Sequence, residues 1–374
     1  MRIGIMLRAI DEKGGVGVYS RNIVLELLQM DRDNEYVLFY RNPENIGLFA
    51  HHHPHVQERL VRAPNKALWD QAAIPLTCRH EQIDVLFHPK FTAPLLAPCP
   101  TVMTVHGADW FMPDQAIYYT WLDVRYMRIM TPLYIKKCTT VISVSQLTTD
   151  NFNQVLNLPP DKMQTVYFAP ARHFRRVADE AELAAVKTRY QLPDHFILTL
   201  TKRLGDGRKN LGQIFKSYAY YHQQTDNPAK LVVGGKDCYL YKAEYGIPDD
   251  GYGADILFPD WIDQQDLPAV YSLADLYLYP SNLEAFPIPL TEAMACGTPI
   301  ITSNVNGLEE IGGDAALLVD PQNTTEIAAA IGRVCHDPAL RQKLSARGLA
   351  RSGLFNWDDC AARTLAILQE AACT

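Results

Sequence analysis

Hydrophobic and polar positions along this 374-residue chain alternate between short apolar runs and longer amphipathic segments. Residues 2–7 form an apolar run, residues 18–30 have the spacing of a helix, and residues 35–40 form a second apolar run. Further apolar runs end in loops at residues 83–88, 101–106 and 140–145. Near-continuous apolar strands separated by helices are typical of a parallel sheet covered on both faces.

The same alternation starts again after residue 170. Apolar runs occupy residues 196–201, 230–235, 255–260, 274–279 and 298–302, and a last helix is predicted over residues 357–370. The chain is also too long for one ordinary core. The predicted fold class is α/β, with two doubly wound Rossmann-like domains facing each other across a cleft. We expect domains at residues 1–170 and 171–355, followed by the helical segment 356–374.

Composition narrows the class of protein. Hydrophobic residues make up 48% of the chain and charged residues 21%, as in a globular protein, and no apolar run reaches the ~18 residues of a membrane span. The first apolar run is too short for a signal peptide. Eight scattered cysteines without Cys-x2-Cys spacing argue against a zinc site and a disulfide framework. These features favour a cytoplasmic protein.

Charge is unevenly distributed. The first 170 residues carry equal numbers of basic and acidic side chains, so the net charge of −7 lies in the remainder. Nucleic acid needs many cationic contacts to phosphate, and it is therefore not an expected partner. A small phosphate ligand needs only a few well-placed cations. Basic residues that lie close together in the acidic half are therefore candidates for binding such a ligand.

Residues 279–302 have the order strand, loop, helix and strand, which places a ligand at the carboxyl end of a parallel sheet. The loop carries Glu284 and the helix carries Glu292. The amides of Phe286 and Ile288 stand where a helix begins and can meet an anion, and Glu292 can reach vicinal hydroxyls. A sugar nucleotide offers both groups. A plain βαβ unit with two solvated glutamates fits the same residues.

Two cations, Arg203 and Lys209, follow the first strand of the second domain and suit a diphosphate. A solvated loop is the alternative. Gly15 and Gly17 lie between the first strand and first helix, where glycines allow close approach of a ligand or form an ordinary turn. Their spacing does not match G-x-G-x-x-G, and no acidic residue ends the second strand, which disfavours a nicotinamide cofactor.

Histidines end two predicted strands of the first domain. His106 is placed to donate to a sugar hydroxyl or to be a hydrogen-bonded structural residue, and Asp109 and Trp110 follow it closely. His88 has a similar position at the end of another strand. Residues at the carboxyl ends of parallel strands face the crevice where ligands bind. His88, Asp109 and Trp110 are therefore acceptor-side candidates.

An aromatic and basic segment spans residues 110–137. Such a helix either docks on an anionic membrane surface or packs on its sheet with solvated charges. The histidine tract at residues 51–53 and the Asp31-x-Asp33 pair have no accompanying ligand cluster, so no metal site is predicted.

Taken together, these motifs make the chain resemble the family-4 retaining glycosyltransferases of the GT-B fold, particularly bacterial enzymes that transfer mannose and related sugars to polysaccharide or lipid-linked acceptors. The resemblance runs nearly end to end, and its most specific element is the Glu-x7-Glu pair at Glu284 and Glu292. It implies a nucleoside-diphosphate sugar as the substrate, with a glycan or lipid-linked glycan as the acceptor. It implies no cofactor and no required metal, and it implies that the last helix crosses back to the first domain.

The resemblance also implies roles for residues. Glu292 would bond the donor ribose and Glu284 would lie near the transferred sugar. The diphosphate would be held by Arg203 and Lys209, and His106 would bond the donor sugar. The remaining donor contacts would come from the first loop and the helix start: Gly15, Gly17, Phe286, Pro287 and Ile288.

Departures from the family pattern leave alternatives open. Ala285 and Pro287 stand where glycines are usual, Asp260 replaces another glycine, and Gly107 replaces an aspartate. Pro287 also removes a backbone donor. A sugar-nucleotide 2-epimerase and a non-catalytic sugar-nucleotide or glycan-binding subunit are therefore the rival interpretations.

Overall fold

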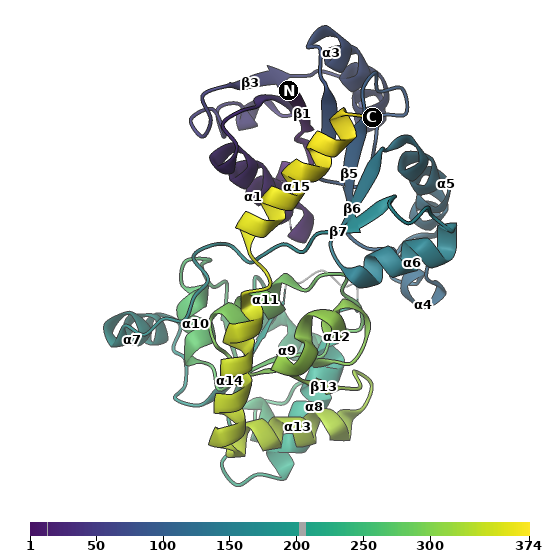
Figure 1. The fold of residues 1–374 in the computed structure, drawn as a ribbon. Coiled ribbons are helices and arrows are strands. Elements are labelled where there is room, and N and C mark those ends of the chain that lie inside the picture. Colours follow the sequence, from purple (N-terminus) through teal and green to yellow (C-terminus); the bar gives the residue numbers. More distant parts are fainter. Residues whose placement is uncertain (13, 202–206) are drawn as a thin grey trace. The chain divides into compact units, whose positions relative to one another are not determined.

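The computed structural model describes residues 1–12, 14–201 and 207–374. The described chain forms two compact units (Figure 1). Unit 1 comprises Met1–Phe168 and Asn356–Thr374, and unit 2 comprises Ala169–Phe355. Each unit has a parallel sheet with helices on both faces, which confirms the predicted α/β class with two doubly wound domains.

Unit 1 contains a seven-stranded sheet in the order β3-β2-β1-β4-β5-β6-β7. All neighbouring strands are parallel. The strands are β1 (Arg2–Met6), β2 (Glu35–Tyr40), β3 (Val56–Leu60), β4 (Val85–His88), β5 (Thr101–Val105), β6 (Thr140–Ser143) and β7 (Met163–Thr165). The helices are α1 (Gly15–Met30), α2 (Lys66–Leu68), α3 (Ile74–His80), α4 (Pro113–Ala116), α5 (Trp121–Lys137), α6 (Gln146–Leu156) and α15 (Trp357–Ala372).

Alternate side chains of the unit 1 strands are buried on opposite faces, as in any covered parallel sheet. Val37 and Phe39 of β2 pack with Trp69, which follows α2, and with Ile74, the first residue of α3. On the other face α15, drawn in yellow in Figure 1, packs along α1 and against β4, β5 and β6. Segment 356–374 therefore completes the core of unit 1.

Unit 2 contains a six-stranded parallel sheet in the order β10-β9-β8-β11-β12-β13. The strands are β8 (Phe196–Leu200), β9 (Lys230–Gly234), β10 (Ile256–Asp260), β11 (Leu276–Tyr279), β12 (Ile300–Ser303) and β13 (Ala316–Val319). The helices are α7 (Glu180–Arg189), α8 (Leu211–Gln223), α9 (Tyr241–Glu244), α10 (Leu267–Leu273), α11 (Ile288–Ala295), α12 (Asn306–Gly312), α13 (Thr324–His336) and α14 (Pro338–Ser352).

Both sheets reverse their strand order beside their first strand. In unit 1, β1 lies between β2 and β4; in unit 2, β8 lies between β9 and β11. Where the order reverses, the loops at the carboxyl ends of the strands diverge and leave room for a ligand. The topology therefore marks the loops after β8 and β11 as the expected ligand position of unit 2. It marks the loops after β1 and β4 in the same way in unit 1.

Candidate functional site

The loops after β8 and β11 of unit 2 bring together two of the predicted site residues. Lys209 precedes α8, and Glu284 lies between β11 and α11. Asn210, with a left-handed φ of 57°, fixes this junction by donating from Nδ2 to the carbonyl of Pro280 at 3.0 Å and to that of Pro321 at 2.7 Å. One asparagine therefore ties together the loops that follow β8, β11 and β13.

Lys209 and Glu284 form an ion pair, with 2.5 Å between Nζ and Oε1. Tyr279, the last residue of β11, accepts a hydrogen bond from Lys209 and donates to Glu284 Oε1 at 2.8 Å. Both charged side chains remain partly exposed. Because an ammonium group has three donors, Lys209 retains one N–H beyond those given to Tyr279 and Glu284. The pair thus holds a lysine in a fixed position at the strand ends with capacity for an anion.

Helix α11 begins beside this pair, but it offers few amide donors. Pro287 is its N-cap and Pro289 lies in its first turn, and neither residue has an N–H. The N–H of Leu290 donates to the carbonyl of Pro287 at 3.0 Å. Ile288 is thus the first-turn position whose amide suits a ligand. The side chain of Phe286 is buried against Phe355, with ring centroids 5.8 Å apart, and anchors the loop.

Glu292 lies on α11 and is half-buried. Burial raises the pKa of Glu292 to about 7, and the hydrogen bond that its carboxylate accepts from Tyr271 at 3.2 Å only partly opposes this. A carboxyl group with this pKa changes charge near neutral pH. It can accept hydrogen bonds from two neighbouring hydroxyls once it is ionised.

Gly307, at the start of α12, holds the Glu284 loop in place. Its N–H donates to the carbonyl of Glu284 at 2.9 Å. A Cβ at Gly307 would lie 2.3 Å from the carbonyl oxygen of Ala285, which is closer than atoms can approach. Only glycine allows this close contact between α12 and the loop.

Gly15 and Gly17 both lie in the first turn of α1. Gly15 is exposed, whereas Gly17 is buried, and a Cβ at Gly17 would lie 1.9 Å from the carbonyl oxygen of Glu12. The need for glycine at position 17 is therefore explained by packing of the helix against its preceding loop. Gly15 remains open to solvent at the carboxyl side of β1.

His106 follows β5, and its ring differs from the expected hydroxyl donor. Its Nε2 lies 3.0 Å from the carbonyl oxygen of Pro89. Since a carbonyl only accepts, Nε2 carries the proton. Burial lowers the pKa of His106 to about 4, so the ring is neutral and Nδ1 is an acceptor. The bond to Pro89 agrees with the alternative of a hydrogen-bonded structural residue, and towards a ligand hydroxyl Nδ1 of His106 would accept, whereas the other expectation is a donor.

The three acceptor-side candidates have different surroundings. His88 is fully buried and its Nδ1 donates to the carbonyl of Thr92 at 2.6 Å, so its side chain supports the fold beneath the strand ends and is not on an acceptor surface. Asp109 accepts from the hydroxyl of Tyr119 at 2.7 Å. Trp110 packs against Phe91, with ring centroids 4.9 Å apart. Asp109 and Trp110 are partly exposed.

Arg203 lies outside the described residues. Within residues 1–12, 14–201 and 207–374, no three His, Cys, Asp or Glu side chains gather as metal ligands, and the eight cysteines are free thiols.

Several residues that shape the unit 2 site were not singled out from the sequence. They are Tyr279, Tyr271 and Gly307, with Asn210 noted only as the start of a helix. Tyr279 ends a predicted strand in the same run as Glu284, so its position was available as a signal. Tyr271 and Gly307 come from neighbouring elements and become visible only through packing.

Each of the two units matches a known protein family. Residues 13–168 match the model described as Glycosyltransferase Family 4, and residues 189–351 match Glycosyl transferases group 1. The chain is 28% identical over 287 residues to the O-antigen chain mannosyltransferase B of Escherichia coli, covering 75% of this chain and 73% of that protein. With further E. coli mannosyltransferases the match spans only 27–28% of their length.

Solved structures share the fold over nearly the whole chain. Sucrose-phosphate synthase of Thermosynechococcus elongatus is 20% identical with a TM-score of 0.76, covering 99% of this chain and 98% of that one. Anabaena Alr3699/HepE, solved in complex with UDP and glucose, is 17% identical with a TM-score of 0.73, covering 99% and 100%. The two family models and this shared architecture show that the chain belongs to the family-4 glycosyltransferases of the GT-B fold.

Proposed function

We propose that this glycosyltransferase moves a hexose from a nucleoside-diphosphate sugar to a hydroxyl of a glycan or lipid-linked glycan, with retention of configuration. The observation that carries the proposal is the Lys209–Glu284 pair at the carboxyl ends of β8 and β11, beside Glu292 and the start of α11. GDP-mannose is the first donor to test, because a relative that matches 75% of this chain is named as a mannosyltransferase. A UDP-sugar is the second, because a protein of the same fold holds UDP.

In the proposed reaction, the bond between the sugar's anomeric carbon and the diphosphate oxygen breaks. The acceptor oxygen forms the new bond to that carbon, and the acceptor proton passes to the departing diphosphate. Negative charge develops on the diphosphate, so a fixed cation there lowers the barrier. Lys209 fulfils this role, assisted by the amide of Ile288 and by Arg203. The carboxylate of Glu292 accepts hydrogen bonds from the ribose hydroxyls, and Glu284 faces the transferred sugar.

The test is a thermal-shift screen with GDP-, UDP-, ADP- and dTDP-sugars, followed by transfer assays with excess EDTA. We expect one nucleotide class to raise the melting temperature and transfer to continue in EDTA, since no step above requires a metal. Loss of transfer in EDTA that manganese restores would contradict metal independence. A new sugar nucleotide formed without acceptor would identify a 2-epimerase.

The prolines at 287 and 289 favour one rival, a binding subunit without catalysis, because they remove amides from the site. Donor binding without transfer to any glycan or lipid-linked acceptor pool would support that rival. Transfer to any of these acceptors would exclude it.

We further propose that unit 1 makes peripheral contact with the inner face of a membrane through α5. No helix in the described part of the chain is long and apolar enough to cross a bilayer. However, one face of α5 presents an apolar stripe at spacings of four, three and four residues: Leu122, Tyr126, Ile129 and Leu133. Trp121 beside it is 69% exposed. Arg125 and Lys136 flank the stripe, as in helices that lie at anionic lipid surfaces.

Leu122→Ser with Ile129→Ser is expected to reduce binding to vesicles containing phosphatidylglycerol by about tenfold or more, since two large apolar side chains no longer enter the lipid. Co-sedimentation measures the bound fraction. Leu76→Ser with Leu96→Ser is the control, because both leucines are more exposed but lie outside the stripe. Equal binding of the two double variants would contradict the proposed contact.

A further inference from the structure

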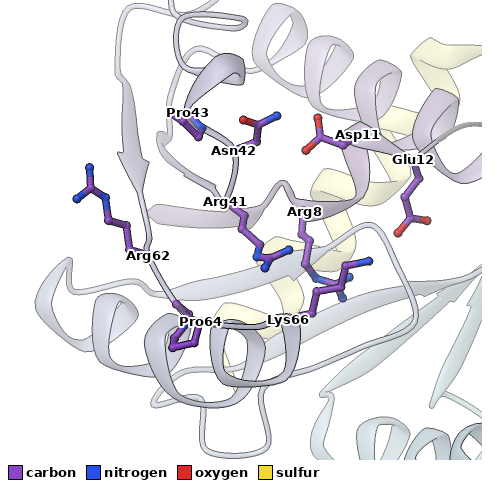
Figure 2. A pocket seen from close by; sticks show the side chains of 10 residues that line it. Arg8, Asp11, Glu12, Arg41, Asn42, Pro43, Arg62, Pro64 and Lys66 are labelled. Carbon is purple, nitrogen blue, oxygen red and sulfur yellow. The ribbon is translucent and has the colours of Figure 1, made fainter.

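A second ligand site is indicated at the carboxyl ends of β1, β2 and β3 in unit 1. A pocket of about 880 Å³ opens there, and its charged lining residues are Arg8, Asp11, Glu12, Arg41, Arg62 and Lys66 (Figure 2). We propose that this pocket binds a phosphoryl group, a phosphate or diphosphate, carried by the acceptor substrate. The identification of the ligand as the acceptor rests on the proposed function, whereas the phosphoryl chemistry rests on the pocket itself.

Sheet register places cations just beyond the ends of three neighbouring strands. Met6 of β1 pairs with Phe39 of β2, so Arg8 and Arg41 each stand two places beyond paired residues. Tyr40 pairs with Leu60 of β3, which brings Arg62 to the same edge. Adjacent strands lie about 4.8 Å apart, so the backbone positions of these three arginines are neighbours at one edge of the sheet.

Arg8 is fixed as one wall of the pocket. It is only 9% exposed, and its guanidinium makes two hydrogen bonds to Asp70, Nε to Oδ1 at 3.0 Å and Nη2 to Oδ2 at 2.9 Å. Thr92 donates to the same carboxylate at 3.0 Å. This buried network holds the Arg8 side chain in place, and Asp70 balances its charge.

The other cations of the pocket lack such partners. Among the described residues, the side chains of Arg41, Arg62 and Lys66 make no hydrogen bond or ion pair. In Figure 2 the side chains of Arg41 and Lys66 point towards that of Arg8, whereas Arg62 points away. Of the acidic lining residues, Glu12 pairs with Lys90, and Asp11 accepts a hydrogen bond from Asn45 at 2.7 Å. The hydrogen bond from the neutral Asn45 does not cancel the charge of Asp11, but Arg41, Lys66 and Arg62 outnumber this carboxylate, so positive charge is in excess in the pocket.

Phosphate fits this arrangement better than carboxylate. A carboxylate has two oxygens and one charge, which a single arginine can satisfy. Here a planar guanidinium from Arg41 and an ammonium from Lys66 approach from different elements, and a phosphoryl group has oxygens for both and a charge near −2. The pocket lies at the carboxyl ends of the strands, on the β2 and β3 side of the β1–β4 position where the strand order reverses. It belongs to unit 1, whereas Lys209 and Glu292 belong to unit 2.

Titration calorimetry with inorganic pyrophosphate on the full chain tests the site. We expect two bound equivalents in the wild-type protein, one in each unit. In Arg41→Gln with Lys66→Gln, we expect the unit 1 equivalent to be lost or weakened by at least about tenfold. The control, Arg79→Gln with Lys136→Gln, removes the same charge from exposed unit 1 positions whose side chains make no hydrogen bond or ion pair to the described residues, and it should keep both equivalents. Equal titrations of the two double variants would overturn the proposal.

Competition identifies the source of the phosphoryl group. Displacement of the unit 1 pyrophosphate by farnesyl diphosphate would indicate a lipid-borne diphosphate, and displacement by glucose 6-phosphate would indicate a phosphorylated sugar. Failure of both compounds would overturn the assignment to an acceptor. Loss of the unit 1 pyrophosphate in the variant, together with no binding of any nucleotide sugar by the wild-type protein, would contradict the proposed function and support the phosphoryl site. If the protein transfers sugar from the donor but the variant binds pyrophosphate like wild type, only the proposal of a phosphoryl site in the unit 1 pocket is contradicted.

Discussion

Lys209→Ala is expected to lower kcat by at least about a hundredfold. A single oriented donor at a developing negative charge is worth about 3 kcal/mol in a transition state, which corresponds to this factor. Lys209 is held by Glu284 and Tyr279 at the strand ends. Prolines at 287 and 289 leave few amides to replace it. Single-turnover rates at saturating donor measure the effect on the chemical step.

The matched control for this change is Lys236→Ala. Lys236 also follows a strand of unit 2, after β9, and is exposed. It should leave the rate within about twofold of wild type, since it lies outside the site. Lys209→Arg should restore part of the rate, because it keeps the charge but changes the geometry. A wild-type rate for Lys209→Ala, or equal losses for both alanine variants, would remove Lys209 from the diphosphate role.

Glu292→Gln is expected to raise the melting temperature of unit 2 at pH 8 and to leave it unchanged at pH 4. The pKa of Glu292 is raised from 4.5 to about 7 in the folded protein, so folding favours the protonated form. This contribution is complete below the unfolded pKa and is lost as pH rises through 7. The ionised group then costs the fold roughly 3 kcal/mol, or about 6–12 °C, and glutamine removes that cost. Calorimetric scans at the two pH values provide the measurement.

The same variant should show the opposite effect on donor binding. Ribose hydroxyls donate to the carboxylate, so wild-type protein must release a proton when it binds donor below pH 7. Its Kd for the nucleotide sugar should therefore increase by up to about tenfold per pH unit below 7. Glu292→Gln should bind weakly at every pH. Equal wild-type affinities at pH 6 and pH 8 would contradict the ribose role of Glu292.

Most of the fold could be predicted from the sequence because buried parallel strands are short, apolar and separated by helices. The exceptions are edge strands. β3 has the sequence VQERL and is only half-buried, so its polar residues hide the strand. β7 has three residues and lies at the other edge. A strand covered on one side by a neighbour needs fewer apolar residues, and its sequence then resembles a loop.

The donor-side candidates could be proposed from the sequence because Glu284 and Glu292 share one short segment. The unit 1 pocket could not, since Arg8, Arg41 and Arg62 are isolated along the chain and each fits a solvated position. Their proximity depends on the strand order β3-β2-β1 in the sheet, and the positions of the strands along the sequence do not give that order. The direction of the His106 hydrogen bond depends on the Pro89 carbonyl, which comes from another loop.

Segment 356–374 has a consequence for the order of folding. Trp357 of α15 is buried beside Tyr19 and Phe168, and Ile367 and Leu368 are buried further along the same helix. During translation the ribosome releases all of unit 2 before this helix emerges. The first domain to be synthesised is thus the last to complete its core, and until α15 arrives the apolar side chains that this helix covers are exposed.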